Sequence, residues 1–301
     1  MTNIVRTTLG FVEYKEVGQG LPIFFLHGGH SNCRVDLFQK GFDTTNFRLI
    51  TPSRPGYGNT PLSVFKTPDE TAKLMVSLLS YLKIEKVVIV GISAGGLTAI
   101  ALASMLKQQN LKLVLISAVT KRWLFHTDKN FKISQVIFNP YLEWLTWAFI
   151  RFLVQVFPRT TAKIFHKAFS NLGNQTITNN EVWQLKRLLL KQRSKRGFLN
   201  DIHQNLKEST ISAIKSPTLI LHSVNDASVD SEMAVYANRK INHSQLELFS
   251  NKWGHLIWIG NDALPAFKVL HKFLKAENLN GRANKNSKAI VQAFPSHEGK
   301  D

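Results

Sequence analysis

Residues 87–100 read VVIVGISAGGLTAI, an apolar β-branched run that passes through a single serine into a helical pattern. Gly91, Ser93 and Gly95 form a Gly-x-Ser-x-Gly sequence at the change of pattern. Between a strand and a helix, this spacing is typical of a tight turn that strains the serine backbone and projects its hydroxyl above the sheet. We expect the two glycines because a side chain there would collide with the neighbouring strand or helix. The stretch therefore predicts a buried strand, a helix and a candidate nucleophile, Ser93, between them.

Apolar runs and amphipathic helical patterns alternate on both sides of this turn. Strands are expected at residues 11–17, 22–26, 47–51, 86–90, 111–117, 218–221 and 245–249. Thr67 followed by Pro68 predicts the start of a helix, and further helices are expected at 94–109 and 262–275. This alternation predicts an α/β fold with a mostly parallel sheet covered by helices on both faces.

The alternation is interrupted at residues 121–210, where only helical patterns occur. This segment is too long for a loop without structure of its own. We expect residues 1–120 and 211–278 to form the α/β core and 121–210 to form a helical cap. The polar residues 279–301 are expected to be a flexible or weakly docked tail.

The charge of the chain is strongly positive and is concentrated in the expected cap. The formal net charge is +18, and residues 121–215 hold 16 Lys and Arg against 5 Asp and Glu, a net +11. Such a concentration attracts nucleic acid, anionic lipid or an anionic substrate, or only solvates the surface. The basic run 191–196 has no interleaved aromatic residues, so we expect no nucleic-acid partner. Contact with an anionic membrane surface stays open.

Cysteine content and the first residues suggest the compartment. Cys33 is the single cysteine, so no disulfide forms within the chain. The stretch MTNIVRTTLGFVEYKE has no apolar leader pattern, and we expect no signal peptide. Together these features predict a cytoplasmic protein.

A serine hydroxyl needs a general base and a group that orients the base. On this architecture the acid and the histidine follow the serine in that order, each after a strand. Asp226 comes shortly after the strand at 218–221, with Asp230 as the alternative acid, and His255 follows the last strand and Gly254. The predicted catalytic residues are therefore Ser93, Asp226 and His255.

Two backbone N–H groups are expected to stabilise the oxyanion. Ala94 follows the nucleophile, and Gly29 lies in the HGGH loop that follows an early strand, where a glycine allows close approach of a ligand. His30 and Asn32 are candidates either for contact with substrate or for a structural role. The sequence has no cluster of metal-ligating residues, no Gly-x-Gly-x-x-Gly and no phosphate-binding loop, so we expect neither metal nor cofactor.

These motifs together resemble those of the α/β-hydrolase superfamily. They are HGG at 27–29, SRPGYGNTP at 53–61, GISAGG at 91–96, PTLILHSVND at 217–226 and GH at 254–255. The resemblance covers about residues 10–275 and implies a sheet of about eight strands with a helical cap inserted after the sixth. Ser223 departs from it, since relatives commonly carry glycine before the acid. Ser93 disfavours the members with an aspartate nucleophile, such as haloalkane dehalogenases and epoxide hydrolases.

The resemblance implies acyl transfer from a small-molecule ester or related acyl substrate. We expect a carboxylesterase that acts on small to medium lipophilic esters through an acyl-enzyme on Ser93. A C–C bond hydrolase, a cofactor-free haloperoxidase or perhydrolase, a lipase and an aminopeptidase stay open, as does a ligand-binding protein on a hydrolase scaffold. Residues 140–158, PYLEWLTWAFIRFLVQVFP, are too short and too charged to span a membrane. They are expected to cover Ser93 with an apolar ceiling, with interfacial binding as the alternative.

Overall fold

The computed structural model describes residues 2–36, 39 and 42–276. Its centre is an eight-stranded sheet with the strand order β1-β2-β4-β3-β5-β6-β7-β8. The strands are β1 (Thr2–Arg6), β2 (Phe11–Val17), β3 (Leu21–Leu26), β4 (Phe47–Pro52), β5 (Val87–Ile92), β6 (Asn110–Ile116), β7 (Thr218–Ser223) and β8 (Ser244–Phe249). β1 and β4 pair antiparallel with β2, and all pairs from β4 to β8 are parallel. The expected mostly parallel sheet is confirmed.

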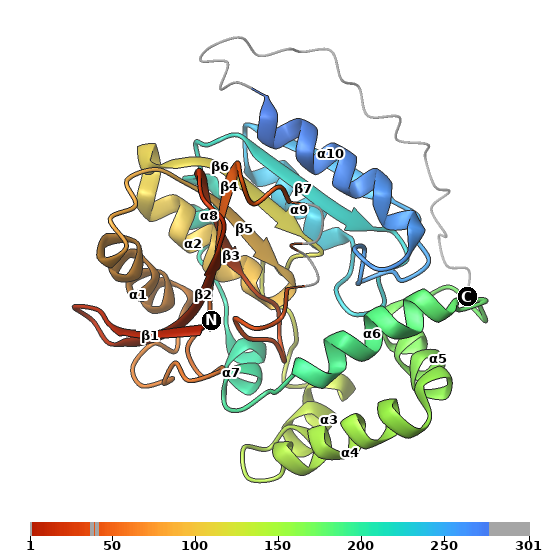
Figure 1. The fold of residues 1–301 in the computed structure, drawn as a ribbon. Coiled ribbons are helices and arrows are strands. Elements are labelled where there is room, and N and C mark those ends of the chain that lie inside the picture. Colours follow the sequence, from red (N-terminus) through yellow and green to blue (C-terminus); the bar gives the residue numbers. More distant parts are fainter. Residues whose placement is uncertain (1, 37–38, 40–41, 277–301) are drawn as a thin grey trace, which may run out of the picture.

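Helices cover both faces of the sheet, as expected (Figure 1). The helices of the core are α1 (Pro68–Tyr81), α2 (Gly96–Leu106), α9 (Glu232–Lys240) and α10 (Leu264–Lys275). Side chains of β5 alternate between the two faces: Val87 and Ile89 pack with α1, α2 and α9, whereas Val88 and Val90 pack in the cluster that contains α10. Each face of β5 is buried, which explains its unbroken apolar sequence.

Two local features differ from the pattern that the sequence predicts. β1 was not expected, because its side chains are mostly exposed and it carries no apolar pattern; pairing with β2 forms it. The helix expected at 94–109 begins instead with a 3₁₀ turn, Ser93–Gly95, and α2 ends at Leu106. The expected start of α1 is confirmed: the Thr67 hydroxyl accepts from the N–H of Glu70, whose carboxylate accepts from the N–H of Thr67.

Between β6 and β7 the chain forms six helices and, within residues 121–210, no strand. They are α3 (Lys129–Ile137), α4 (Glu143–Val156), α5 (Pro158–Phe169), α6 (Asn179–Lys191), α7 (Gly197–His203) and α8 (Glu208–Ser212). We use the word cap for residues 121–210; α3 to α6 lie together beside the sheet, at the lower right of Figure 1. Its division from the core as a separate domain stays a prediction, and the expected tail at 279–301 lies outside the described residues.

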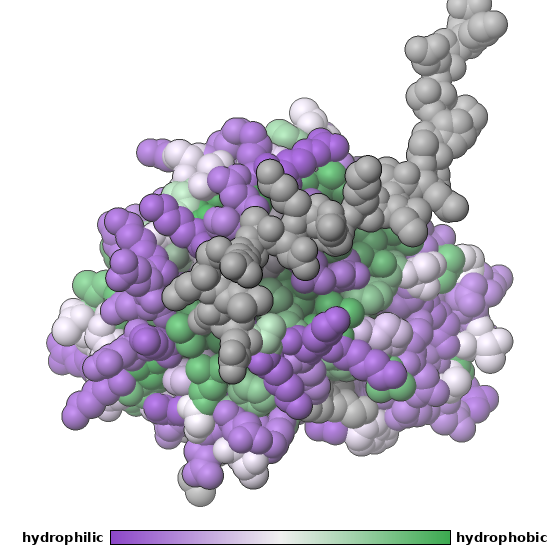
Figure 2. Space-filling view, turned by 90° about the horizontal axis from the view of Figure 1, so that it is seen from above, coloured by the Kyte–Doolittle hydropathy of each residue, from purple (hydrophilic) through white to green (hydrophobic). Residues whose placement is uncertain are grey.

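The surface on the side of α10 is mostly hydrophilic. Figure 2 looks down on the side that carries α10, where polar residues dominate and hydrophobic residues gather toward the middle. Over the described part of the chain, none of the helices has the length and apolar character needed to cross a bilayer.

Candidate active site

Ser93 lies in a strained turn between β5 and α2. Its φ is +50°, a left-handed backbone conformation that serine rarely adopts. A Cβ at Gly95 would lie 2.2 Å from the carbonyl oxygen of Leu26, and one at Gly91 would lie 2.5 Å from the Cβ of Ala99. The expected strand–turn–helix is confirmed, with both glycines required by the close packing of β3 and α2 against the turn.

The structure brings Ser93, Asp226 and His255 together. His255 Nε2 lies 3.0 Å from Ser93 Oγ, and His255 Nδ1 lies 2.8 Å from Asp226 Oδ2. The three residues are buried, although they come from loops after β5, β7 and β8. This arrangement lets an imidazole take the serine proton on one side while a carboxylate stabilises it on the other.

Asp226 is held as an ionised carboxylate. Its Oδ1 accepts the N–H groups of Ser228 and Val229, both at 2.8 Å. Burial opposes ionisation, but His255 and His222 outweigh it through charge and hydrogen bonds and keep the pKa of Asp226 well below its ordinary value. His222 Nε2 lies 3.2 Å from Asp226 Oδ2, so the carboxylate faces two imidazoles. No motif in the sequence predicts that His222 contacts the carboxylate of Asp226.

Asp230, the alternative acid, takes no part in this arrangement. It is exposed, and its carboxylate accepts the N–H of Glu232 at 2.8 Å. Ser223, where the sequence departs from its relatives, ends β7 without a positive φ. Its hydroxyl accepts the N–H of Asn225 at 3.1 Å, so the serine fits the acid loop without distorting it.

The cap contributes directly to the position of His255. The carbonyl of Phe169, at the end of α5, accepts the N–H of His255 at 2.8 Å and that of Ala227 at 3.2 Å. The Phe169 ring stacks on the His255 imidazole with centroids 5.8 Å apart. Gly254 has φ +51°, and a Cβ there would lie 2.3 Å from the Phe169 carbonyl. Sequence reasoning missed Phe169, because the group that acts is a backbone carbonyl that any residue supplies.

The two expected oxyanion donors lie side by side next to Ser93. A Cβ added to Gly29 would be 3.9 Å from the Cβ of Ala94. Within the described part of the chain, no backbone carbonyl accepts the N–H of either residue. Both N–H groups are therefore free to bind a ligand oxygen, and their role as the oxyanion hole stays a prediction.

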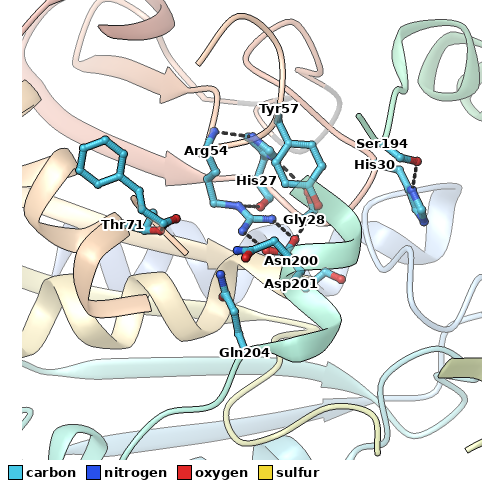
Figure 3. Close-up of polar contacts among 12 residues, drawn as sticks. His27, Gly28, His30, Arg54, Tyr57, Thr71, Ser194, Asn200, Asp201 and Gln204 are labelled. Atoms are coloured by element: carbon cyan, nitrogen blue, oxygen red, sulfur yellow. Dashed lines mark hydrogen bonds and ion pairs between the residues drawn. The ribbon is translucent and has the colours of Figure 1, made fainter. Parts of the chain in front are cut away.

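A buried ion pair joins the loop of Gly29 to the cap. Arg54 donates to the carbonyl of His27 at 2.7 Å and makes two bonds to Asp201 of α7, at 2.8 and 2.7 Å (Figure 3). The Tyr57 hydroxyl donates to the same carboxylate at 2.5 Å. The backbone N–H of Arg54 donates to His27 Nε2, and burial lowers the pKa of His27 well below its ordinary value, which keeps that nitrogen an acceptor. We call Arg54, Asp201 and Tyr57 the Arg54 cluster; the sequence motif SRPGYG contains two of its members but does not reveal Asp201.

A cavity of about 370 Å³ lies between the turn of Ser93 and the cap. Its core-side lining includes Gly28, Gly29, Ser93 and His255, and its cap lining is mostly aromatic and aliphatic. The cap residues concerned are Trp123, Leu124, Phe138, Trp147, Ile150, Phe165, Phe169, Leu188 and Phe198. Among the residues that the structure describes, no Lys, Arg, Asp or Glu side chain lines this cavity.

The two candidate substrate contacts differ. His30 lines the cavity, with its ring centroid 3.7 Å from that of Phe198 and Nδ1 2.6 Å from Ser194 Oγ. Burial lowers the pKa of His30 to about 3, so the ring is uncharged at neutral pH. Asn32 is outside the lining: its amide donates to the Lys191 carbonyl and its oxygen accepts the N–H of Arg34. The structure therefore gives Asn32 a structural role, which removes it from our proposal.

Among the residues that the structure describes, no group of three or more His, Cys, Asp or Glu is placed to hold a metal ion. The arrangement at Ser93 can transfer a proton and form a covalent bond through its own side chains.

Comparisons with known proteins agree with this fold. The sequence pattern of the alpha/beta hydrolase fold family matches residues 22–262. An uncharacterized hydrolase of Bacillus subtilis (strain 168), YcgS, is 37% identical over 89% of this chain and 96% of its own length.

Two solved structures share the fold. An alpha/beta hydrolase fold protein from Nakamurella multipartita superposes with a TM-score of 0.74 at 24% identity, covering 91% of this chain and 99% of its own. The esterase EaEST from Exiguobacterium antarcticum does so with a TM-score of 0.67 at 21% identity, covering 92% and 100%.

Proposed function

The chain is a hydrolase that belongs to the α/β hydrolase fold family, and from this premise we propose that it is a carboxylesterase acting on small to medium lipophilic esters. The observation that carries the proposal is the Ser93–His255–Asp226 contact at the wall of a cavity lined without charged side chains. One of the solved structures with a similar fold is the esterase EaEST, and this likeness supports the same activity for our protein.

In the proposed reaction Ser93 Oγ attacks the ester carbonyl carbon while His255 Nε2 takes its proton. Asp226 stabilises the imidazolium, and the N–H groups of Gly29 and Ala94 bind the developing oxyanion, with the start of α2 adding its positive end. Collapse of the intermediate breaks the C–O bond, and the leaving alkoxide receives the proton from His255. Water then attacks the acyl-enzyme by the same route, which releases the carboxylic acid and restores Ser93.

The lining of the cavity supports a neutral lipophilic substrate. A C–C hydrolase that acts on a dienoate-like acid needs a cation to pair with the carboxylate, because a buried unpaired charge is costly. The described lining contains no lysine or arginine, and His30 is uncharged at neutral pH. The basic residues of the cap lie outside this lining, so we assign the substrate no negative charge.

Cys33 is buried and free, which suits a reducing compartment. On this basis we propose the cytoplasm as the place where the enzyme acts.

The proposal is tested with p-nitrophenyl esters from acetate to decanoate, alongside a dienoate C–C substrate and a peroxide-dependent halogenation assay. We expect turnover of esters, strongest at short to medium acyl length. We expect neither cleavage of the dienoate nor halogenation above the Ser93→Ala background. Turnover of the dienoate or halogenation in preference to every ester would contradict the assignment. Reaction with a fluorophosphonate without turnover of any ester would indicate a binding protein on a hydrolase scaffold.

A further inference from the structure

The outward side of the cap carries an unusual concentration of exposed apolar side chains. Of the 24 large hydrophobic residues that are exposed in the described chain, 12 lie between residues 133 and 164. We define the cap face by six of them that lie on α4 or shortly before it. Its members are Tyr141, Trp144, Leu145, Phe149, Phe152 and Val156, with exposed fractions from 48% to 81%. All but Tyr141 belong to α4.

Helix α4 is apolar on both of its sides. Trp147 and Ile150 line the cavity and Val154 is fully buried, so its inner side is satisfied by the protein. On the outer side, Gln155 is the one polar residue among those exposed. A helix that is hydrophobic all round is normally buried all round. The outer side of α4 therefore has the apolar sequence of a buried helix side, although it is exposed in this structure.

The helices that precede and follow α4 in the chain, α3 and α5, carry exposed basic residues. Lys129 and Lys132 are exposed on α3, and Arg159, Lys163 and Lys167 are exposed at spacings of four on α5. Within the described part of the chain, none of the five forms an ion pair. Residues 121–170 hold 8 Lys and Arg against 2 Asp and Glu, and of those two Glu143 is buried against Arg193. These two helices of the cap thus carry positive charge that no ion pair of the described residues offsets.

We propose that the cap face docks onto an anionic lipid surface, with α4 in the plane of the headgroups. An exposed aromatic and aliphatic helix side on a strongly basic cap suits such a surface, since apolar residues enter the boundary of the acyl chains and cations meet the phosphates. A second copy of the chain fits less well, because it carries the same basic cap and the same net charge of +18. Because the inner side of α4 lines the cavity, docking places one wall of the proposed active site at the surface where lipophilic esters dissolve.

The test is flotation of the full chain with large unilamellar vesicles of phosphatidylcholine, with and without 30% phosphatidylglycerol. We expect the protein to float with the anionic vesicles at low salt and to be released at high salt. Arg159→Glu/Lys163→Glu/Lys167→Glu is expected to weaken this binding on the order of a hundredfold or more. Phe149→Ser/Phe152→Ser is expected to weaken it at least tenfold.

Matched controls separate the cap face from general properties of the chain. Lys73→Glu/Lys86→Glu/Lys215→Glu changes the net charge equally on exposed positions of the core and is expected to bind within a fewfold of wild type. Phe11→Ser/Leu264→Ser removes two exposed apolar residues elsewhere and is expected to bind as wild type does. Turnover of a soluble ester by all four variants reports that they are folded, since none of these residues lines the cavity.

Three results would overturn the proposal. They are failure of the wild type to float with anionic vesicles at low salt, equal loss of binding in the core and cap triple variants, and a wild-type dimer by sedimentation velocity that Phe149→Ser/Phe152→Ser dissociates. Vesicle binding is measured without turnover, so its failure is distinguishable from failure of the proposed esterase activity.

Discussion

The two walls of the cavity are built in different ways. The core wall consists of tight loops in which backbone geometry decides the residue: Ser93 has a positive φ, and Gly91 and Gly95 have no space for a side chain. The cap wall consists of aromatic and aliphatic side chains on helices, where many residues of similar size would pack equally well. The comparison indicates that the core wall determines the chemistry and the cap wall determines the substrate.

The walls are nevertheless joined, and two of the contacts between them reach the loops of the predicted site. The Phe169 carbonyl of the cap accepts the N–H of His255, and Asp201 of the cap pairs with Arg54 beside the His27 carbonyl. Through these contacts the cap supports both the base and the loop of Gly29. The cap is therefore part of the scaffold of the chemistry as well as a cover.

The largest expected effect concerns the acid of the core wall. Asp226→Asn should lower kcat by about 10⁴-fold, because the amide cannot stabilise the imidazolium and favours the wrong tautomer of His255. Asp230→Asn, four residues further along the same loop, should change kcat less than about twofold, since that carboxylate is exposed and bonds only locally. Steady-state kinetics on one ester compares the two variants. Equal losses would contradict the assignment of Asp226.

The next effect concerns the junction of the walls. Asp201→Ala leaves the Arg54 guanidinium buried without its partner and should lower the free energy of unfolding by about 3–5 kcal/mol. Arg54→Met/Asp201→Leu removes both charges and should cost clearly less, because no unpaired charge remains. Urea denaturation measures both. A double variant as unstable as the single one would show that the pair itself, rather than the orphaned charge, decides the stability.

A smaller effect should appear on the cap wall alone. Ile150→Trp fills the cavity from α4 and should lower kcat/KM for the longest accepted acyl chain by about 10- to 200-fold, with little change for acetate. Ala148→Trp adds the same side chain on the exposed side of the same helix and should leave the chain-length profile unchanged. A uniform loss over all chain lengths in Ile150→Trp would break the division between the walls.

A further expected effect, which is small near neutral pH, is a dependence of stability on pH. The pKa of His30 is about 3 in the folded protein and about 6.5 in the unfolded chain, so between these values the unfolded state holds more protons. The stability contributed by neutral His30 is complete above pH 6.5 and falls as the pH drops below it, by up to about 1.4 kcal/mol per pH unit. In acid titrations followed by circular dichroism, His30→Gln should unfold at lower pH than wild type. The control His243→Gln, at an exposed position, should unfold with wild type; an unchanged midpoint in His30→Gln would contradict the burial argument.

The difference between the core wall and the cap wall also explains which features the sequence could predict. The strands of the core other than β1, and the positions of Ser93, Asp226 and His255 after them, follow from apolar runs and from the residues at the ends of strands. The contacts of Phe169 and Asp201 were not predictable, because one is made by a backbone carbonyl and the other by an aspartate on a cap helix without a motif. The sequence left Asn32 open between substrate contact and a structural role, because sequence position alone does not show that both ends of its amide bind backbone.

We propose that Ser93, the strained serine of the core wall, is the nucleophile. The most direct test of this assignment is peptide mapping by mass spectrometry after treatment with a fluorophosphonate. We expect one adduct, located at Ser93, and no adduct in a folded Ser93→Ala variant. An adduct on another residue, or labelling that persists in Ser93→Ala, would contradict it.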